Sequence, residues 1–178
     1  PAARGLGLGT RLVGALAGWS RAKGRDLLGA SFGATPELVR FWRHCGLFPV
    51  QLGCRRNAAS GAHSVVVLSS LSDAGDALAE QARRQLLPRL QVLLAGPLRL
   101  VDAAVIADML CGARGTEAAL DSADKRALMS FAGATRGFDA ALPVLHRLTT
   151  SALPRALAAN ALTDEQAAAL IACVLQHR

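Results

Sequence analysis

No run of about 18 uncharged apolar residues occurs in this chain, so we predict no transmembrane helix. Tyrosine is absent, and aromatic residues make up only 4% of the 178 residues. The apolar content is nevertheless 52%, which supports a true core and argues against a disordered chain. The first residue is Pro1 rather than methionine, and the chain begins inside a motif. We therefore expect it to be part of a longer protein.

Clustered metal ligands are also missing. The cysteines are scattered, and none belongs to a C-x-x-C pair: Cys45, Cys54, Cys111 and Cys173. The histidines show no metal-ligand spacing with them: His44, His63, His146 and His177. We predict no metal site, and we expect buried or incidental thiols in a reducing, cytoplasmic compartment.

Acidic residues are scarce in the first part of the chain. Residues 1–71 contain two acids, Asp26 and Glu37, against nine lysines and arginines, which gives a net charge of +7. Residues 72–178 contain eleven residues of each sign and sum to zero. A basic face suits a polyanion such as nucleic acid or a phosphorylated cofactor. A solvated arginine surface in an arginine-rich proteome would give the same count, and both interpretations stay open.

The most informative stretch is Ser31 to Gly46. It follows an apolar run, residues 27–32, that predicts a buried strand. Thr35 then predicts a helix N-cap, with Pro36 at the first helical position, and Gly46 ends the helix. Many α/β proteins bind ligands at such a strand–helix junction. The alternative is a well-punctuated βα unit without a site.

The chain opens with a glycine-rich loop, Arg4 to Thr10, before a helix expected over residues 9–23. Alternate glycines let successive N–H groups point inward as an anion-binding nest at a helix N-terminus. No Gly-Lys-Ser/Thr follows, so the loop is not a Walker A motif. It also fits the dinucleotide fingerprint poorly, because Thr10 stands where glycine is needed.

Two more strands are expected over residues 47–52 and 64–68, joined by a loop over residues 53–62 with Arg55 and Arg56 at its base. From residue 72 only helices are expected: over residues 72–95 with Pro88 kinking or dividing it, then over 102–111, 122–132, 140–150, 154–160 and 163–177. The predicted fold class is α+β, with a three-stranded sheet and two helices over residues 1–71 and a helical bundle over 72–178. Three strands make a thin sheet, so we expect a missing segment or a second copy in a homo-oligomer to cover one edge.

The stretches quoted next carry a resemblance to a known family. RGLGLG looks like the pyrophosphate loop of GNAT acetyltransferases. GASFGATPELVRFWRHCGLFPVQLG and RRNAASGAHSVVVLSSLS resemble the tRNA(Met) cytidine acetyltransferase family. The resemblance covers residues 4–71 and implies the second half of a GNAT domain. In that family an ATP-driven module, a GNAT domain and a helical RNA-binding region together acetylate the wobble cytidine of elongator methionine tRNA with acetyl-CoA.

The resemblance also implies site residues. The cofactor would lie against Arg4, Gly5, Leu6, Gly7, Leu8, Gly9 and Thr10, and near Glu37 and His44. The family usually has arginine at position 44, and no catalytic base is assigned. The leading hypothesis is a C-terminal piece of such an enzyme, inactive alone. A second is a non-catalytic RNA-binding or protein-interaction module whose phosphate contacts are Arg40, Arg43, Arg55 and Arg56. A third is a chain that merely folds, as an oligomer.

Overall fold

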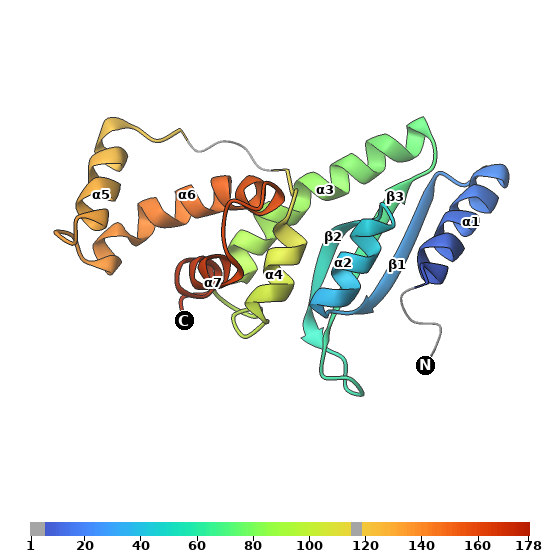
Figure 1. The fold of residues 1–178 in the computed structure, drawn as a ribbon, viewed down its shortest axis with the longest axis horizontal. Helices are drawn as coiled ribbons and strands as arrows, with labels where there is room; N and C mark the ends of the chain where they lie inside the picture. The colour runs from blue at the N-terminus through green and yellow to red at the C-terminus, as the bar shows by residue number, and fades with distance from the viewer. Residues whose placement is uncertain (1–5, 115–118) are drawn as a thin grey trace. The chain divides into compact units, whose positions relative to one another are not determined.

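A computed structural model describes residues 6–114 and 119–178. The chain divides into two compact units, Pro1–Leu86 and Leu87–Arg178, and the division falls inside one helix, α3 (Asp73–Leu93). Each unit is described by itself. The helices and strands confirm the α+β class (Figure 1).

The first unit is a three-stranded antiparallel sheet with helices. The strand order is β1-β3-β2, so β3 lies in the middle and β1 and β2 form the edges. Leu27 pairs with Ser70 at one end of the sheet and Gly33 with Ser64 at the other. The elements of this unit, with the helix that leaves it, are α1 Leu8–Ala22, β1 Leu27–Gly33, α2 Pro36–His44, β2 Phe48–Arg56, β3 His63–Ser70 and α3 Asp73–Leu93.

Alternation along β3 places the core of this unit. Val65 and Val67 have no exposed surface, whereas Val66 between them is half-buried, because successive side chains of a strand point to opposite faces. Val39 of α2 is also fully buried. Val39 therefore anchors α2 in the core, whereas Glu37, Arg40 and His44 are exposed.

Strand β2 runs further than predicted. It reaches Arg56 rather than residue 52, with a register shift between Leu52 and Arg56. The predicted loop over residues 53–62 is correspondingly shorter, because Asn57 organises the turn: its side-chain oxygen accepts hydrogen bonds from the N–H groups of Ala59 and Ser60 at 2.9 and 3.1 Å. Arg55 and Arg56 thus end a strand, and the prediction that they lie in the loop is wrong.

The second unit is helical. Its elements after the shared helix α3 are α4 Ala103–Leu110, α5 Ser122–Ala132, α6 Phe138–Ala158, α7 Asp164–Ala169 and a π-helix, η1 Leu170–Leu175. Aliphatic side chains form its core, and those with at most 1% exposure include Leu90, Leu98, Ile106, Met109, Leu110 and Ile171. The predicted capping box is confirmed, since the side chains of Thr163 and Gln166 bond each other's backbone N–H groups.

Prolines do not divide these helices. Pro88 lies inside α3, and α6 continues through both Pro143 and Pro154, so the prediction of separate helices over 140–150 and 154–160 is wrong. A helix-interior proline costs about 3 kcal/mol. Burying one large apolar side chain contributes about 2 kcal/mol, and this stretch of α6 buries Leu153 and Pro154 in the core. Burial of these two residues therefore offsets the cost of Pro154 within the helix.

The chain end is anchored by a residue that the sequence did not single out. Gln176 is fully buried, and its side-chain nitrogen donates hydrogen bonds to the carbonyl oxygens of Leu98 and Val101 at 3.3 and 2.8 Å. Gln176 directly follows the π-helix η1 and caps it, with its own N–H donating to the carbonyl oxygen of Ile171.

Candidate functional site

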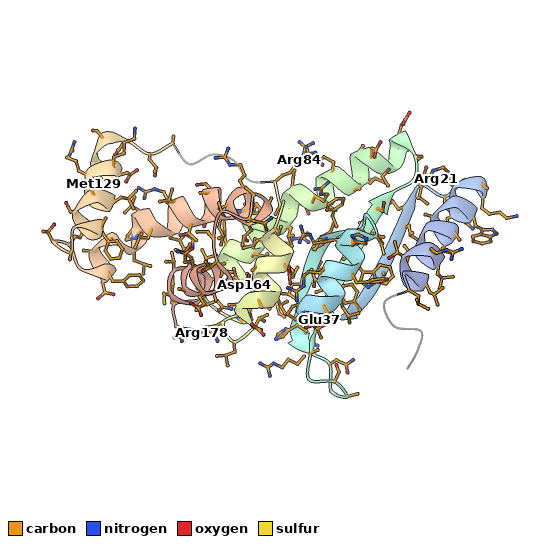
Figure 2. The ribbon with its side chains drawn as sticks, in the orientation of Figure 1. Arg21, Glu37, Arg84, Met129, Asp164 and Arg178 are labelled. Carbon is orange, nitrogen blue, oxygen red and sulfur yellow. The ribbon has the colours of Figure 1, made fainter. Side chains whose placement is uncertain are left out.

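The junction between β1 and α2 forms as the sequence predicts. Thr35 is the N-cap, in an extended conformation, and its hydroxyl oxygen accepts the N–H of Leu38 at 3.3 Å. Glu37 lies in the first turn (Figure 2). Its pKa is lowered because its carboxylate accepts its own backbone N–H and then the Thr35 hydroxyl, with a smaller contribution from Arg40. The start of α2 therefore already holds a carboxylate.

The start of α1 has the opposite character. Gly7 is its N-cap, with a left-handed φ of 67°, and no side chain caps the helix. The first turn contains no acid, so nothing on α1 itself neutralises the positive end of the helix dipole. The N–H groups of Leu8, Gly9 and Thr10 lack partners within the helix by geometry. Leu6 is exposed beside them, whereas Arg4 and Gly5 lie outside the described residues.

The start of α1 touches α2. A Cβ atom added to Gly9 would lie 3.1 Å from two ring carbons of Phe41, so glycine allows the close approach. The thiol of Cys45 lies 3.9 Å from the Thr10 hydroxyl oxygen, next to the end of α2. The structure thus brings together the two segments that the sequence assigned to one site.

Glu37 and His44 lie further apart than the residues of this contact between α1 and α2. Both are exposed on α2, and their seven-residue spacing puts them on a similar face about 10 Å apart along the helix axis. They lie near opposite ends of this nine-residue helix, so one small group could not contact both, whereas an extended ligand could.

The four arginines named for RNA come from two elements. Arg40 is exposed and Arg43 half-buried on α2, and Arg55 and Arg56 are exposed at the end of β2. Arg56 pairs with His63, whose carbonyl oxygen accepts the N–H of Ala34 at 2.7 Å. The end of β2 therefore lies at the same end of the sheet as the start of α2.

Two features of this unit were not predicted. His63 is buried, and its Nδ1 lies 2.7 Å from the Gly53 carbonyl oxygen, so Nδ1 carries a proton when it bonds there. A hollow of about 240 Å³ is lined by residues that include Phe48, Asp76, Glu80 and Arg83. The guanidinium carbon of Arg83 lies 4.0 Å from the ring centre of Phe48. No sequence spacing pointed to either feature, because both depend on pairings between separate elements.

Side chains that could bind a metal ion do not cluster in the described part of the chain. Within residues 6–114 and 119–178, no three His, Cys, Asp or Glu side chains come together in a way that could hold a metal ion. The four cysteines are free thiols. Among the helices that the structure describes, none is long and apolar enough to span a membrane.

Comparison with known proteins decides the family. The model of the GNAT acetyltransferase 2 family matches residues 16–72, and that of a tRNA-binding domain matches residues 75–176. A curated relative, the tRNA(Met) cytidine acetyltransferase TmcA of Nitrosococcus halophilus, is 41% identical over 181 residues, which cover 100% of this chain and 24% of the relative. The chain belongs to the tRNA(Met) cytidine acetyltransferase family.

Other members of the tRNA(Met) cytidine acetyltransferase family give the same result. The protein of Salmonella typhimurium is 37% identical and covers 86% of this chain, and that of Haloarcula marismortui is 34% identical and covers 98%. The matches cover 21% and 23% of those two relatives. The chain therefore spans about a quarter of the length of the relatives that it matches.

Proposed function

We propose that this chain carries part of the acetyl-CoA site and the RNA-binding region of an RNA acetyltransferase acting on the wobble cytidine of tRNA, and that it is inactive alone. The observation that carries the proposal is the contact between the glycine-rich start of α1 and α2, through Gly9 and Phe41. This contact sets an uncapped, acid-free helix start beside the helix that holds Glu37 and His44. The GNAT family match over residues 16–72 supports it.

The residues of α1 suit the anionic part of the cofactor. The N–H groups of Leu8, Gly9 and Thr10 would donate to the pyrophosphate oxygens, and Gly7 supplies the left-handed turn before them. Arg4 and Gly5, the first residues of the same motif, would extend the cradle. The carboxylate of Glu37 disfavours a phosphate at the start of α2, so the pyrophosphate belongs at α1 and a more distant part of the ligand near α2.

Acetyl-CoA would supply an acetyl group activated as a thioester. The acetyl group would pass to the cytidine amine, with a carbon–nitrogen bond forming as the carbon–sulfur bond breaks, and the proton lost by the amine would neutralise the departing thiolate. The basic residues of this chain would hold the RNA backbone during that step through phosphate contacts. No residue of this chain is assigned as the base.

Titration of this chain with acetyl-CoA tests the cofactor half of the proposal. We expect weak binding, about millimolar or weaker, with the largest backbone amide shifts at Leu8 to Thr10. Gly7→Ala should abolish the shifts, because alanine disfavours the left-handed φ of 67°. Gly24→Ala is the matched control, since Gly24 has a φ of 66° and equally open surroundings at the other end of α1. Tight calorimetric binding by this chain would contradict the expectation that it is inactive because its site is incomplete.

A salt series of tRNA binding tests the RNA half. Each neutralised phosphate contributes about −0.7 to −0.9 to the slope of log affinity against log salt. Arg55→Ala with Arg56→Ala should therefore make the slope shallower by about 1.4 to 1.8. The control pair is Lys23→Ala with Arg25→Ala. It removes the same charge near the start of β1, at the opposite end of the sheet from Arg55 and Arg56, and should change the slope less. No binding at low salt, or equal effects of the two pairs, would remove these arginines from the interface.

The non-catalytic alternative has a distinct signature. A chain that binds tRNA with this salt dependence but shows no acetyl-CoA shifts at Leu8 to Thr10 would be an RNA-binding module. The match of a tRNA-binding domain over residues 75–176 supports RNA as the partner under either proposal.

A further inference from the structure

The hollow of about 240 Å³ belongs to the first unit and lies where the start of β2 and the end of β3 meet the first half of α3. This is the opposite end of the sheet from the β1–α2 junction, because Ser70 pairs with Leu27 whereas the junction follows Gly33. Pockets for drug-sized ligands measure about 300 to 1,000 Å³, so the hollow suits a smaller group, such as one planar base. The residues that line it include Phe48, Ser69, Ser70, Asp76, Glu80 and Arg83.

A planar wall bounds the hollow. The guanidinium carbon of Arg83 lies 4.0 Å from the centre of the Phe48 ring, and both side chains line the hollow. This cation–π contact and the half-buried position of both residues hold the guanidinium group in place. Unpaired bases of RNA stack on aromatic rings and on the planes of arginine guanidinium groups. The wall therefore suits a flat ligand better than a compact one.

The charge of the hollow differs from that of the rest of the unit. Residues 72–86 contain three acids against two arginines, which gives a net charge of −1, whereas residues 1–71 carry +7. The carboxylates of Asp76 and Glu80 repel a phosphate group from the hollow. An ammonium group would be attracted to them, but Arg83 repels it and the planar wall adds nothing to its binding. A nucleotide therefore fits with its base in the hollow and its phosphate outside, toward the basic surface.

The exposed carboxylate of Asp76 selects among the bases. Glu80 already accepts a hydrogen bond from Nε of Arg84 at 3.2 Å, whereas Asp76 is exposed at the hollow. An ionised carboxylate offers two acceptor oxygens, which match a pair of parallel N–H donors. Guanine presents such a pair, N1–H and N2–H, on its Watson–Crick edge. Adenine and cytosine place an amino donor beside an acceptor nitrogen, and uracil places one N–H between two carbonyl oxygens. Guanine therefore matches Asp76 best.

We propose that this hollow binds the guanine base of an unpaired RNA nucleotide. The base stacks against the guanidinium group of Arg83, and the carboxylate of Asp76 accepts its N1–H and N2–H donors. The nucleotide is unpaired because a base pair would occupy the same edge of the guanine. This inference rests on the proposed function, in which RNA is the partner. It gives the first unit a base-reading site at the end of the sheet away from the start of α1.

Titration with mononucleotides tests the hollow without tRNA or acetyl-CoA. We expect GMP to bind in about the millimolar range, with the largest backbone amide shifts at Ser69 and Ser70. IMP lacks only the N2 amino group and should bind about tenfold more weakly, because one hydrogen bond to a charged group is lost. UMP should bind more weakly still. Equal binding of GMP and IMP, or no shifts at Ser69 and Ser70, would overturn the proposal.

Paired variants of α3 locate the contacts. Asp76→Asn should weaken GMP binding about tenfold, whereas Asp73→Asn changes another exposed acid of the first turn, outside the hollow, and should leave it unchanged. Arg83→Lys keeps the charge but removes the plane, and should weaken binding about fivefold. Arg84→Lys is its control on the same helix (Figure 2). Equal effects within either pair would count against the site. The comparison of GMP with IMP on the unchanged chain stands even if a variant does not fold.

A single-stranded RNA distinguishes an RNA nucleotide from a free one. The ligand is an oligouridylate that carries one central guanosine, compared with the same oligomer carrying inosine. Removing a carboxylate by itself strengthens the binding of a polyanion, so Asp73→Asn should leave the affinity for the guanosine oligomer equal or slightly higher. Asp76→Asn should instead lower it severalfold, to the level of the inosine oligomer. The opposite sign of the two effects separates base recognition from general electrostatics.

Other occupants give results that overturn the proposal. Selective binding of GMP without any preference between the guanosine and inosine oligomers would assign the hollow to free nucleotides. Amide shifts at Ser69 and Ser70 with butylammonium, but not with GMP, would assign it to a cation. The salt series of tRNA binding reads the basic surface and the GMP titration reads the hollow. Either one can fail while the other holds, so failure of this inference and failure of the proposed function are distinguishable.

Discussion

Gly75→Ala is expected to destabilise the first unit by about 3 kcal/mol, although alanine normally stabilises a helix relative to glycine. Gly75 lies in the first turns of α3, and an added Cβ would lie 2.0 Å from the carbonyl oxygen of Asp26. That carbonyl already accepts the N–H of Leu71 at 2.8 Å, and the Ser72 hydroxyl bonds the Asp26 carboxylate. The backbone therefore has little freedom to move away from a methyl group.

Urea unfolding followed by tryptophan fluorescence measures this effect, because Trp19 and Trp42 both belong to the first unit. Gly18→Ala is the control: Gly18 lies in α1 with no atom within 4 Å of an added Cβ, so alanine should stabilise by about 0.5 to 1 kcal/mol. The prediction fails if Gly75→Ala unfolds at the same urea concentration as the unchanged chain.

Gln176→Ala is expected to destabilise the second unit by about 3 kcal/mol. The change removes two hydrogen bonds from the carbonyl oxygens of Leu98 and Val101 and opens a cavity at a fully buried position. Gln176→Glu should be worse, because a carboxylate would face two carbonyl oxygens with no proton to donate.

Far-UV circular dichroism during urea unfolding follows this unit, whose described secondary structure consists of helices. Gln166→Ala is the matched control. It deletes the same side chain at an exposed position and removes one capping bond, so it should cost at most about 1 kcal/mol. Equal losses from the two glutamines would show that burial of Gln176 contributes nothing beyond its hydrogen bonds.

Local chemistry explains which predictions succeeded. Thr35 followed by Pro36, and Thr163 followed by Gln166, specify helix starts within a few residues, and both starts formed as expected. The end of β2 and the continuity of α6 depend instead on distant partners. Pairing with β3 extends β2 to Arg56, and burial of Leu153 carries α6 past its prolines. Neither the partner strand nor the core contact is written in the local pattern.

The candidate site, too, could be predicted only in part from the sequence. The sequence marked the start of α1 and the helix α2 separately, by glycines and by a cap. The family resemblance assigned both to one site, but local pattern alone could not predict their contact, because it depends on Gly9 fitting against the ring of Phe41. The hydrogen bond between Nδ1 of His63 and the carbonyl oxygen of Gly53 could not be predicted from residue spacing. It depends on the register of the hairpin formed by β2 and β3.

The strand order β1-β3-β2 also has a consequence during protein synthesis. β1 and β2 each pair with β3 and not with each other, yet β3 comes last of the three along the chain. No strand pair of this sheet can therefore form until residues 63–70 have left the ribosome, and two strands with unpaired edges wait until then. A translational pause before residue 63 would prolong that exposure, whereas a pause well after residue 70 would come when the central strand is already available to both neighbours.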